Sequence, residues 1–212
     1  MKLGKLSATG IMALTVALAA PAVANAQNCI GLPIANQKAA ASFTVAFPED
    51  AKTFGFSGRM RLDGPLSLGA SYSFTSIDNV DPKTHSFGVS GSYDLPVTQS
   101  AAVCAVAGVE HSQITVSDIK FSDLAIPLGV GIGKSFAAGN NAELVPFAMP
   151  HLLWIRSSIS NSGVSINDSS AEFGLDVGAT YRVQQLMLHA GLNFSSIEGS
   201  STTFSVGVGY AF

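Results

Sequence analysis

The last eleven residues, from Thr202 to Phe212, alternate between large apolar and small side chains. The large residues occupy every second position and are Phe204, Val206, Val208, Tyr210 and Phe212. Because successive side chains of a strand point to opposite faces, this stretch predicts a strand with one apolar face and one face of very small residues. The apolar face would enter the core of a soluble sandwich or face the lipid around a membrane barrel.

Composition makes an ordinary soluble surface hard to build. Charged residues are 12% of the 212-residue chain, whereas roughly 25% is usual in soluble domains. The formal net charge is −3, without a basic patch or an acidic tail, and the length fits a single domain. We therefore expect no nucleic-acid partner, no metal and no cofactor.

The N-terminus has the pattern of a secretory signal peptide. Lys2 and Lys5 precede a short apolar run over 11–20, and Ala24-Asn25-Ala26 is a small-x-small cleavage pattern. We expect residues 1–26 to be a cleaved signal peptide, 27–37 a periplasmic lead, and 38–212 the folded domain. No later stretch has the roughly 20 apolar residues of a membrane helix, so the exported protein is either soluble or spans as a barrel.

Alternation at period two continues through most of the chain and predicts about ten strands, with eight as the alternative. Most are about nine or more residues long, which suits a tilted strand crossing a bilayer better than a soluble sheet. Pro146, Pro150 and His151 interrupt the pattern and predict a bulge or a locally bent register. The predicted strands are 38–47, 53–62, 66–75, 84–95, 101–110, 123–136, 143–156, 171–183, 186–195 and 202–212.

The connections and the aromatic residues both favour the membrane. Short turns are expected at one end of the strands, and longer polar loops over 77–83, 111–122 and 157–170 at the other. The aromatics form two bands, as interfacial girdles do. One band holds Phe47, Phe54, Phe74, Phe87, Phe173, Phe194 and Phe204, and the other holds Tyr93, Phe136, Phe147, Tyr181, Tyr210 and Phe212. The fold expected is an all-β, antiparallel up-and-down transmembrane β-barrel, closed where strand 202–212 pairs with both 186–195 and 38–47.

With its signal peptide, its alternating strands and the terminal Val208-Gly209-Tyr210-Ala211-Phe212, the chain resembles the small outer-membrane β-barrel proteins of the OmpA/OmpX-like and opacity type. The resemblance implies a place in the bacterial outer membrane, with outer-membrane lipid as a partner. It also implies that the barrel assembly machinery reads Tyr210 and Phe212 as an assembly signal. The usual barrel of that family has eight strands.

Eight titratable residues fall on the predicted inner face: Arg59, Arg61, Asp94, Glu110, Glu172, Asp176, Arg182 and His189. They would form either a gate or selectivity ring, or a paired polar interior that keeps a small barrel shut, which we favour. A two-residue turn would set Asp176 beside Asn193 and Thr180 beside His189. The many inward Gly and Ser residues leave space, so we also expect a narrow water path or a plug formed by residues 27–37.

Cys29 and Cys104 are the two cysteines of the chain. An oxidising periplasm allows a disulfide between them, but two unpaired thiols or a link between chains fit the sequence equally well.

No recognisable catalytic motif is present. A rim group could be drawn from His85, Glu110, His111 and Asp123, and His151 falls on the nominal lipid face, where it would suit a lipid-cleaving His/Ser pair, unless the nearby prolines turn it inward. We expect a non-catalytic barrel with a structural or surface-interaction role that binds a surface ligand through its extracellular loops. A narrow porin-like channel for small solutes is the alternative, and an enzyme acting on lipid or peptide comes third.

Overall fold

The computed structural model describes residues 28–32, 37–77, 83–96, 101–116, 119–161, 164–196 and 202–212. The signal peptide 1–26, its cleavage site after Ala26 and part of the 27–37 lead lie outside the described residues, so they remain predictions. Among the described residues, no helix has the length and apolar character needed to span a bilayer.

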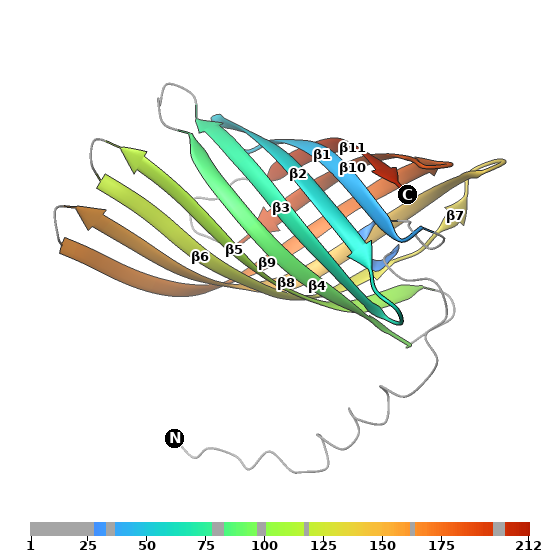
Figure 1. The fold of residues 1–212 in the computed structure, drawn as a ribbon, viewed down its shortest axis with the longest axis horizontal. Coiled ribbons are helices and arrows are strands. Elements are labelled where there is room, and N and C mark those ends of the chain that lie inside the picture. Colours follow the sequence, from blue (N-terminus) through green and yellow to red (C-terminus); the bar gives the residue numbers. More distant parts are fainter. Residues whose placement is uncertain are drawn as a thin grey trace, which may run out of the picture.

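One short 3-10 turn and eleven strands make up the described part of the chain (Figure 1). They are η2 (Asn28–Ile30), β1 (Ala39–Phe47), β2 (Ala51–Arg61), β3 (Leu66–Ile77), β4 (Thr84–Leu95), β5 (Ala102–Val116), β6 (Ile119–Gly133), β7 (Phe136–Ala137), β8 (Ala142–Asn161), β9 (Val164–Val183), β10 (Leu186–Ser195) and β11 (Thr203–Ala211).

The strands form a closed antiparallel β-barrel. Each is hydrogen-bonded to its neighbours in chain order, β11 pairs with both β10 and β1, and β6 pairs with β8. The two-residue β7 only extends the turn end of β8, so ten of the eleven described strands make the ring. The predicted closure by 202–212 and the predicted count of about ten strands are therefore confirmed, as is the setting of Asp176 beside Asn193 and Thr180 beside His189.

The prolines do not bend the register, so the predicted bulge is wrong. β8 keeps one register with β9 over its whole length, and with β6 it is the same on both sides of Pro150. Likewise, β5 and β6 are in one register on both sides of Pro127. Proline lacks an N–H group, so it removes a ladder bond without adding a residue to the strand.

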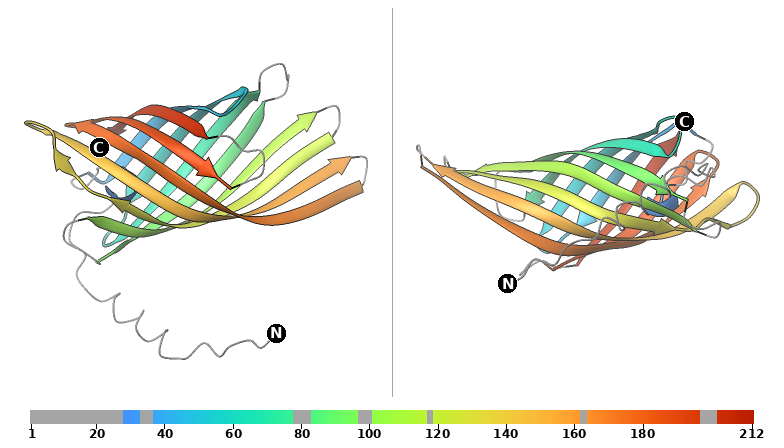
Figure 2. Two further views of the ribbon diagram at one scale, coloured as in Figure 1. Left: turned by 180° about the vertical axis from the view of Figure 1, so that it is seen from behind. Right: turned by 90° about the horizontal axis from the view of Figure 1, so that it is seen from below.

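The prediction of long polar loops over 111–122 and 157–170 is also wrong, because the strands β5, β6, β8 and β9 continue into these ranges. β8 and β9 each have 20 residues, and β5 and β6 each have 15, whereas about 9–11 suffice to cross a bilayer. These four strands extend beyond the rest of the ring at one end (Figures 1 and 2). We name that end the hairpin end, and the opposite end, where the C-terminus lies, the turn end.

Large apolar side chains cover the outer face of the ring, with exposed fractions of 61% at Phe87, 55% at Leu128 and 59% at Leu152. Aromatic rings stack across neighbouring strands near the hairpin end, as Phe47 does on Phe204. One predicted member of the other band is misplaced, because Phe147 points into the lumen. Uninterrupted alternation along β8 puts it on the same face as the fully buried Val145.

Candidate lumen site

The N-terminal segment 28–32, which we name the plug, lies inside the lumen toward its turn end (Figure 2). Its η2 turn contacts β5, β6 and β8 from within the ring (Figure 2). Cys29 and Cys104 form a disulfide, with their Cα atoms 5.9 Å apart and both residues fully buried. Gly131 on β6 makes room for the plug, since a Cβ there would lie 2.6 Å from the carbonyl oxygen of Cys29.

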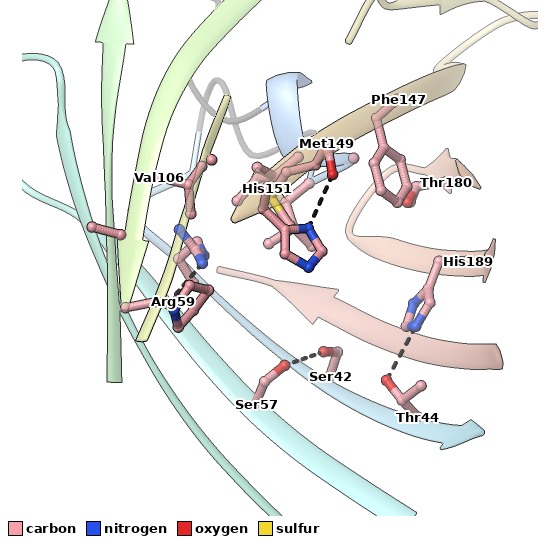
Figure 3. Close-up of a pocket in the computed structure, with 17 residues that line it drawn as sticks. Ser42, Thr44, Ser57, Arg59, Val106, Phe147, Met149, His151, Thr180 and His189 are labelled. Atoms are coloured by element: carbon pink, nitrogen blue, oxygen red, sulfur yellow. Dashed lines mark hydrogen bonds between the residues drawn. The ribbon is translucent and has the colours of Figure 1, made fainter. Parts of the chain in front are cut away.

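A cavity of about 360 Å³ lies next to the plug in the interior of the barrel (Figure 3). One part of its wall is apolar and includes Ile30, Leu32 and Phe147, while Arg59 and His189 contribute polar groups. A second cavity of about 240 Å³ shares Arg59 and Leu32 with the first. The plug therefore occupies part of the lumen and leaves space beside it.

Glycines of the inner face lie under large side chains from the adjacent strand. Each of five large residues is paired in register with a glycine, and a Cβ on that glycine would come within 3.3 Å of the large side chain. The pairs are Arg59 over Gly69, Phe147 over Gly178, His151 over Gly174, Met187 over Gly209 and His189 over Gly207. The space that the sequence predicted at these glycines is thus occupied, and the water path remains a proposal.

An ion pair lies near the turn end. Arg182 Nε is 2.7 Å from Glu143 Oε1, and another guanidinium nitrogen donates to Gln37 Oε1 at 2.8 Å. Ser135 Oγ donates to the second carboxylate oxygen of Glu143 at 2.5 Å. Both charged side chains are at most one-fifth exposed, and a buried charge without a partner would be costly. Each of the two charges therefore compensates the other.

A second polar cluster lies farther along the lumen. His151 Nδ1 is 3.2 Å from the Met149 carbonyl oxygen and 3.5 Å from Asp176 Oδ2, and since both partners accept, this nitrogen carries the hydrogen. Asn193 Nδ2 donates to the other oxygen of Asp176 at 2.5 Å. His151 therefore faces inward and not toward lipid, because alternation along β8 is unbroken.

His189 and Arg59 have hydroxyl partners. His189 Nε2 lies 3.1 Å from Thr44 Oγ1, which it reaches by crossing Gly207 (Figure 3). Arg59 crosses Gly69 and donates to the hydroxyls of Ser90 and Ser92, each at 3.1 Å. Within the described residues, no carboxylate forms an ion pair with Arg59.

The remaining predicted lumen residues are spread along the barrel. Arg61 pairs in register with Ser67 at the turn end, Glu110 accepts a hydrogen bond from Ser86, and Glu172 accepts one from Ser196 at 3.2 Å. Asp94 lies beside the disulfide, with its carboxylate within 4.8 Å of both sulfurs. Disulfide sulfurs are not thiolates, so these three residues do not form a metal site.

The rim group considered for catalysis is not assembled. His85 hydrogen-bonds Tyr72 on the outer face, Nδ1 to Oη 2.8 Å, and His111 also lies on the outer face. Glu110 and Asp123 lie on the inner face, where Asp123 is 3.5 Å from Ser112 Oγ. The two histidines and the two acids are thus divided between the two faces of the sheet.

Sequence reasoning missed Glu143, His151 and the two serines that bind Arg59. The first two were obscured by the prolines of β8, although counting alternate positions back from Leu152 would have placed both inside. Ser90 and Ser92 carried no signal, because inward serines are numerous and only the register with β2 and β3 brings them under the guanidinium.

No protein-family model matches the chain, and no curated protein matches it in sequence. Among solved structures, the KdgM porin in complex with disordered oligogalacturonate is 11% identical, with a TM-score of 0.42 over 82% of this chain and 99% of that one. This porin and the two proteins named next are outer-membrane barrels. Ail of Yersinia pestis in complex with sucrose octasulfate is 14% identical, with a TM-score of 0.44 over 83% of this chain and 99% of that one. The N-terminal β-barrel domain of Pseudomonas aeruginosa OprF is 13% identical, with a TM-score of 0.38 over 83% and 98%. With likenesses this distant, the barrel fold rests on the strand pairing of the chain itself.

Proposed function

We propose that this protein is a non-catalytic outer-membrane barrel with a plugged lumen, and that its β5–β6 and β8–β9 hairpins present a binding surface outside the cell. Outer-membrane lipid would cover its apolar outer face, and the assembly machinery would read Tyr210 on β11 and Phe212 directly after it. The proposal rests chiefly on one observation, which is a change of polarity on the outer face of the long strands.

Within the ring, the outer face is apolar, whereas most residues of the inner face are small or polar. On β8 the outward residues change from Leu152 and Trp154 to Arg156, Ser158 and Ser160 toward the hairpin end. Such a change is expected where strands leave the hydrocarbon region and enter the headgroups and water. The short turns would then be periplasmic and the long hairpins extracellular.

The inner face carries one apolar row in the same region. Ile114, Phe121, Ile159 and Ile166 are paired in register across β5, β6, β8 and β9, so their side chains form one row on one face. We name this the apolar row. Ile159 is 44% exposed and Ile166 is 66% exposed, which is unusual for isoleucines that lipid does not cover. An exposed apolar row on a rigid sheet suits contact with another surface.

Adhesion measurements test this role. Cells that display the protein are compared for binding to protein-coated and polysaccharide-coated surfaces, with the Ile159→Ser/Ile166→Ser variant beside them. We expect this variant to lose most of the binding. The Ser160→Ala/Asn167→Ala variant, altered on the opposite face of the same hairpin, should keep it. Equal binding by both variants, or by cells that lack the protein, would refute a role for the apolar row.

A narrow channel is the second candidate, favoured by the cavities that remain in the lumen. In planar bilayers we expect the refolded protein to give no discrete conductance steps, because we propose that the plug closes the turn end. Steps that appear only after deletion of residues 27–37 would show a path that the plug closes, and steps from the intact protein would establish a pore.

A further inference from the structure

We propose that the lumen contains a binding site for a small organic anion, centred on the guanidinium of Arg59. This site is separate from the apolar row and goes beyond the surface role proposed above.

The first reason is charge. Arg59 lines both of the cavities described above, and no Asp or Glu is among the described residues that line either of these two. Its two observed partners, Ser90 and Ser92, are neutral hydroxyls, which leave three of its five N–H donors available. A cation inside a protein is costly unless an opposite charge compensates it. A bound anion would supply that charge.

The second reason is the set of hydroxyl groups around the guanidinium. Ser42 and Ser57 line both cavities with Arg59 and hydrogen-bond each other at 2.7 Å (Figure 3). Thr44 lines the larger cavity with its partner His189. A carboxylate offers two oxygens, which can accept charge-assisted bonds from the guanidinium and further bonds from such hydroxyls.

The third reason is the opposite wall, which fixes the rest of the ligand. Ile30, Leu32, Phe147 and Met149 give the larger cavity an apolar side. Its volume of about 360 Å³ lies in the range of small-molecule sites, roughly 300–1,000 Å³. The site therefore fits a monoanion with a compact apolar body better than a sugar or an inorganic ion. Because two of these residues belong to the plug, the site is complete only when the plug is in place.

Three ligands of one shape test the proposal: benzoate, benzyl alcohol and benzylamine. Each is titrated by calorimetry into the refolded full chain in detergent micelles, with protein-free micelles as the blank. We expect benzoate to bind at least about tenfold more tightly than benzyl alcohol, because a charge-assisted hydrogen bond is stronger than a neutral one by a free energy of that size. We expect no binding of benzylamine. No benzoate binding, or equal binding of benzoate and benzyl alcohol, would overturn the site.

Variants then assign the charge to Arg59. Arg59→Gln should lower the affinity for benzoate about tenfold without changing the affinity for benzyl alcohol. Arg59→Lys should keep most of the preference for benzoate over benzyl alcohol. Ile166→Ser, which alters only the apolar row, should bind benzoate like the unaltered protein. Loss of benzoate preference in Ile166→Ser, or its retention in Arg59→Gln, would contradict the proposal, and the ligand series on the unaltered chain decides it even if a variant fails to fold.

Discussion

Reducing the bond between Cys29 and Cys104 should destabilise the barrel. The two residues are 75 positions apart, so the bond closes a long loop in the unfolded chain. In the chain-entropy model, a loop of this length corresponds to a ceiling of about 4.5 kcal/mol, and measured losses are typically about 2–4 kcal/mol. Reduction also frees the plug, which packs against Gly131 and Phe147. We therefore expect the free energy of unfolding to fall by about 2–4 kcal/mol.

The measurement is equilibrium urea unfolding of the protein refolded into lipid vesicles, with and without a reductant present throughout. The Cys29→Ser/Cys104→Ser variant is the control, because it should match the reduced protein and not respond to reductant. A loss below about 1 kcal/mol would mean that the bond does not constrain the unfolded chain, and the reasoning from loop length would be refuted. A response of the serine variant to reductant would show that the effect does not come from this disulfide.

Three further predictions follow from the same structure. Gly131→Ala should displace the plug and lower the fraction of disulfide-bonded protein in a free-thiol count, whereas Gly58→Ala, which meets nothing within 4 Å, should not; equal thiol counts would contradict this. Leu128→Arg should destabilise the barrel in vesicles by about 2–4 kcal/mol, because it puts a charge on the face that we propose lipid covers, while Ile166→Arg, beyond the proposed membrane region, should change the unfolding free energy little; equal losses would place the membrane boundary elsewhere. Glu143→Gln should cost about 1–3 kcal/mol by the same urea assay, since it leaves a mostly buried guanidinium without its anion, and no loss would mean that water compensates the charge.

Much of the ring could be predicted because alternation and turn length together determine register. The two-residue turn after Val183 fixes how β9 meets β10, and this places Asp176 beside Asn193 without any knowledge of the structure. The closing contacts of β11 followed from an even number of strands. These inferences use only the period of two and the need to satisfy strand edges.

The plug, the long hairpins and the large inward residues were harder to predict from the sequence. A segment such as 28–32 has no periodicity, and its position depends on a distance between cysteines that sequence cannot supply. In the hairpins, Ile159 and Ile166 alternate with polar residues as in any strand, but the surrounding serines resemble loop composition. At His151, two nearby prolines suggested a bent strand, although a missing N–H group changes hydrogen bonding and not the direction of side chains.

The pairing of large inward residues with glycines has a consequence for how this sequence can diverge. His151 and Gly174 share a limited space between neighbouring strands, and the side chain of His151 fills it. His189 and Gly207 share such a space in the same way. Enlarging a glycine is tolerated only if its partner shrinks, and the reverse exchange, with the large residue moved to the other strand, keeps the total constant. In related sequences, the two positions of each pair should therefore covary. Such covariation would reveal the strand register in an alignment even where neither residue is conserved.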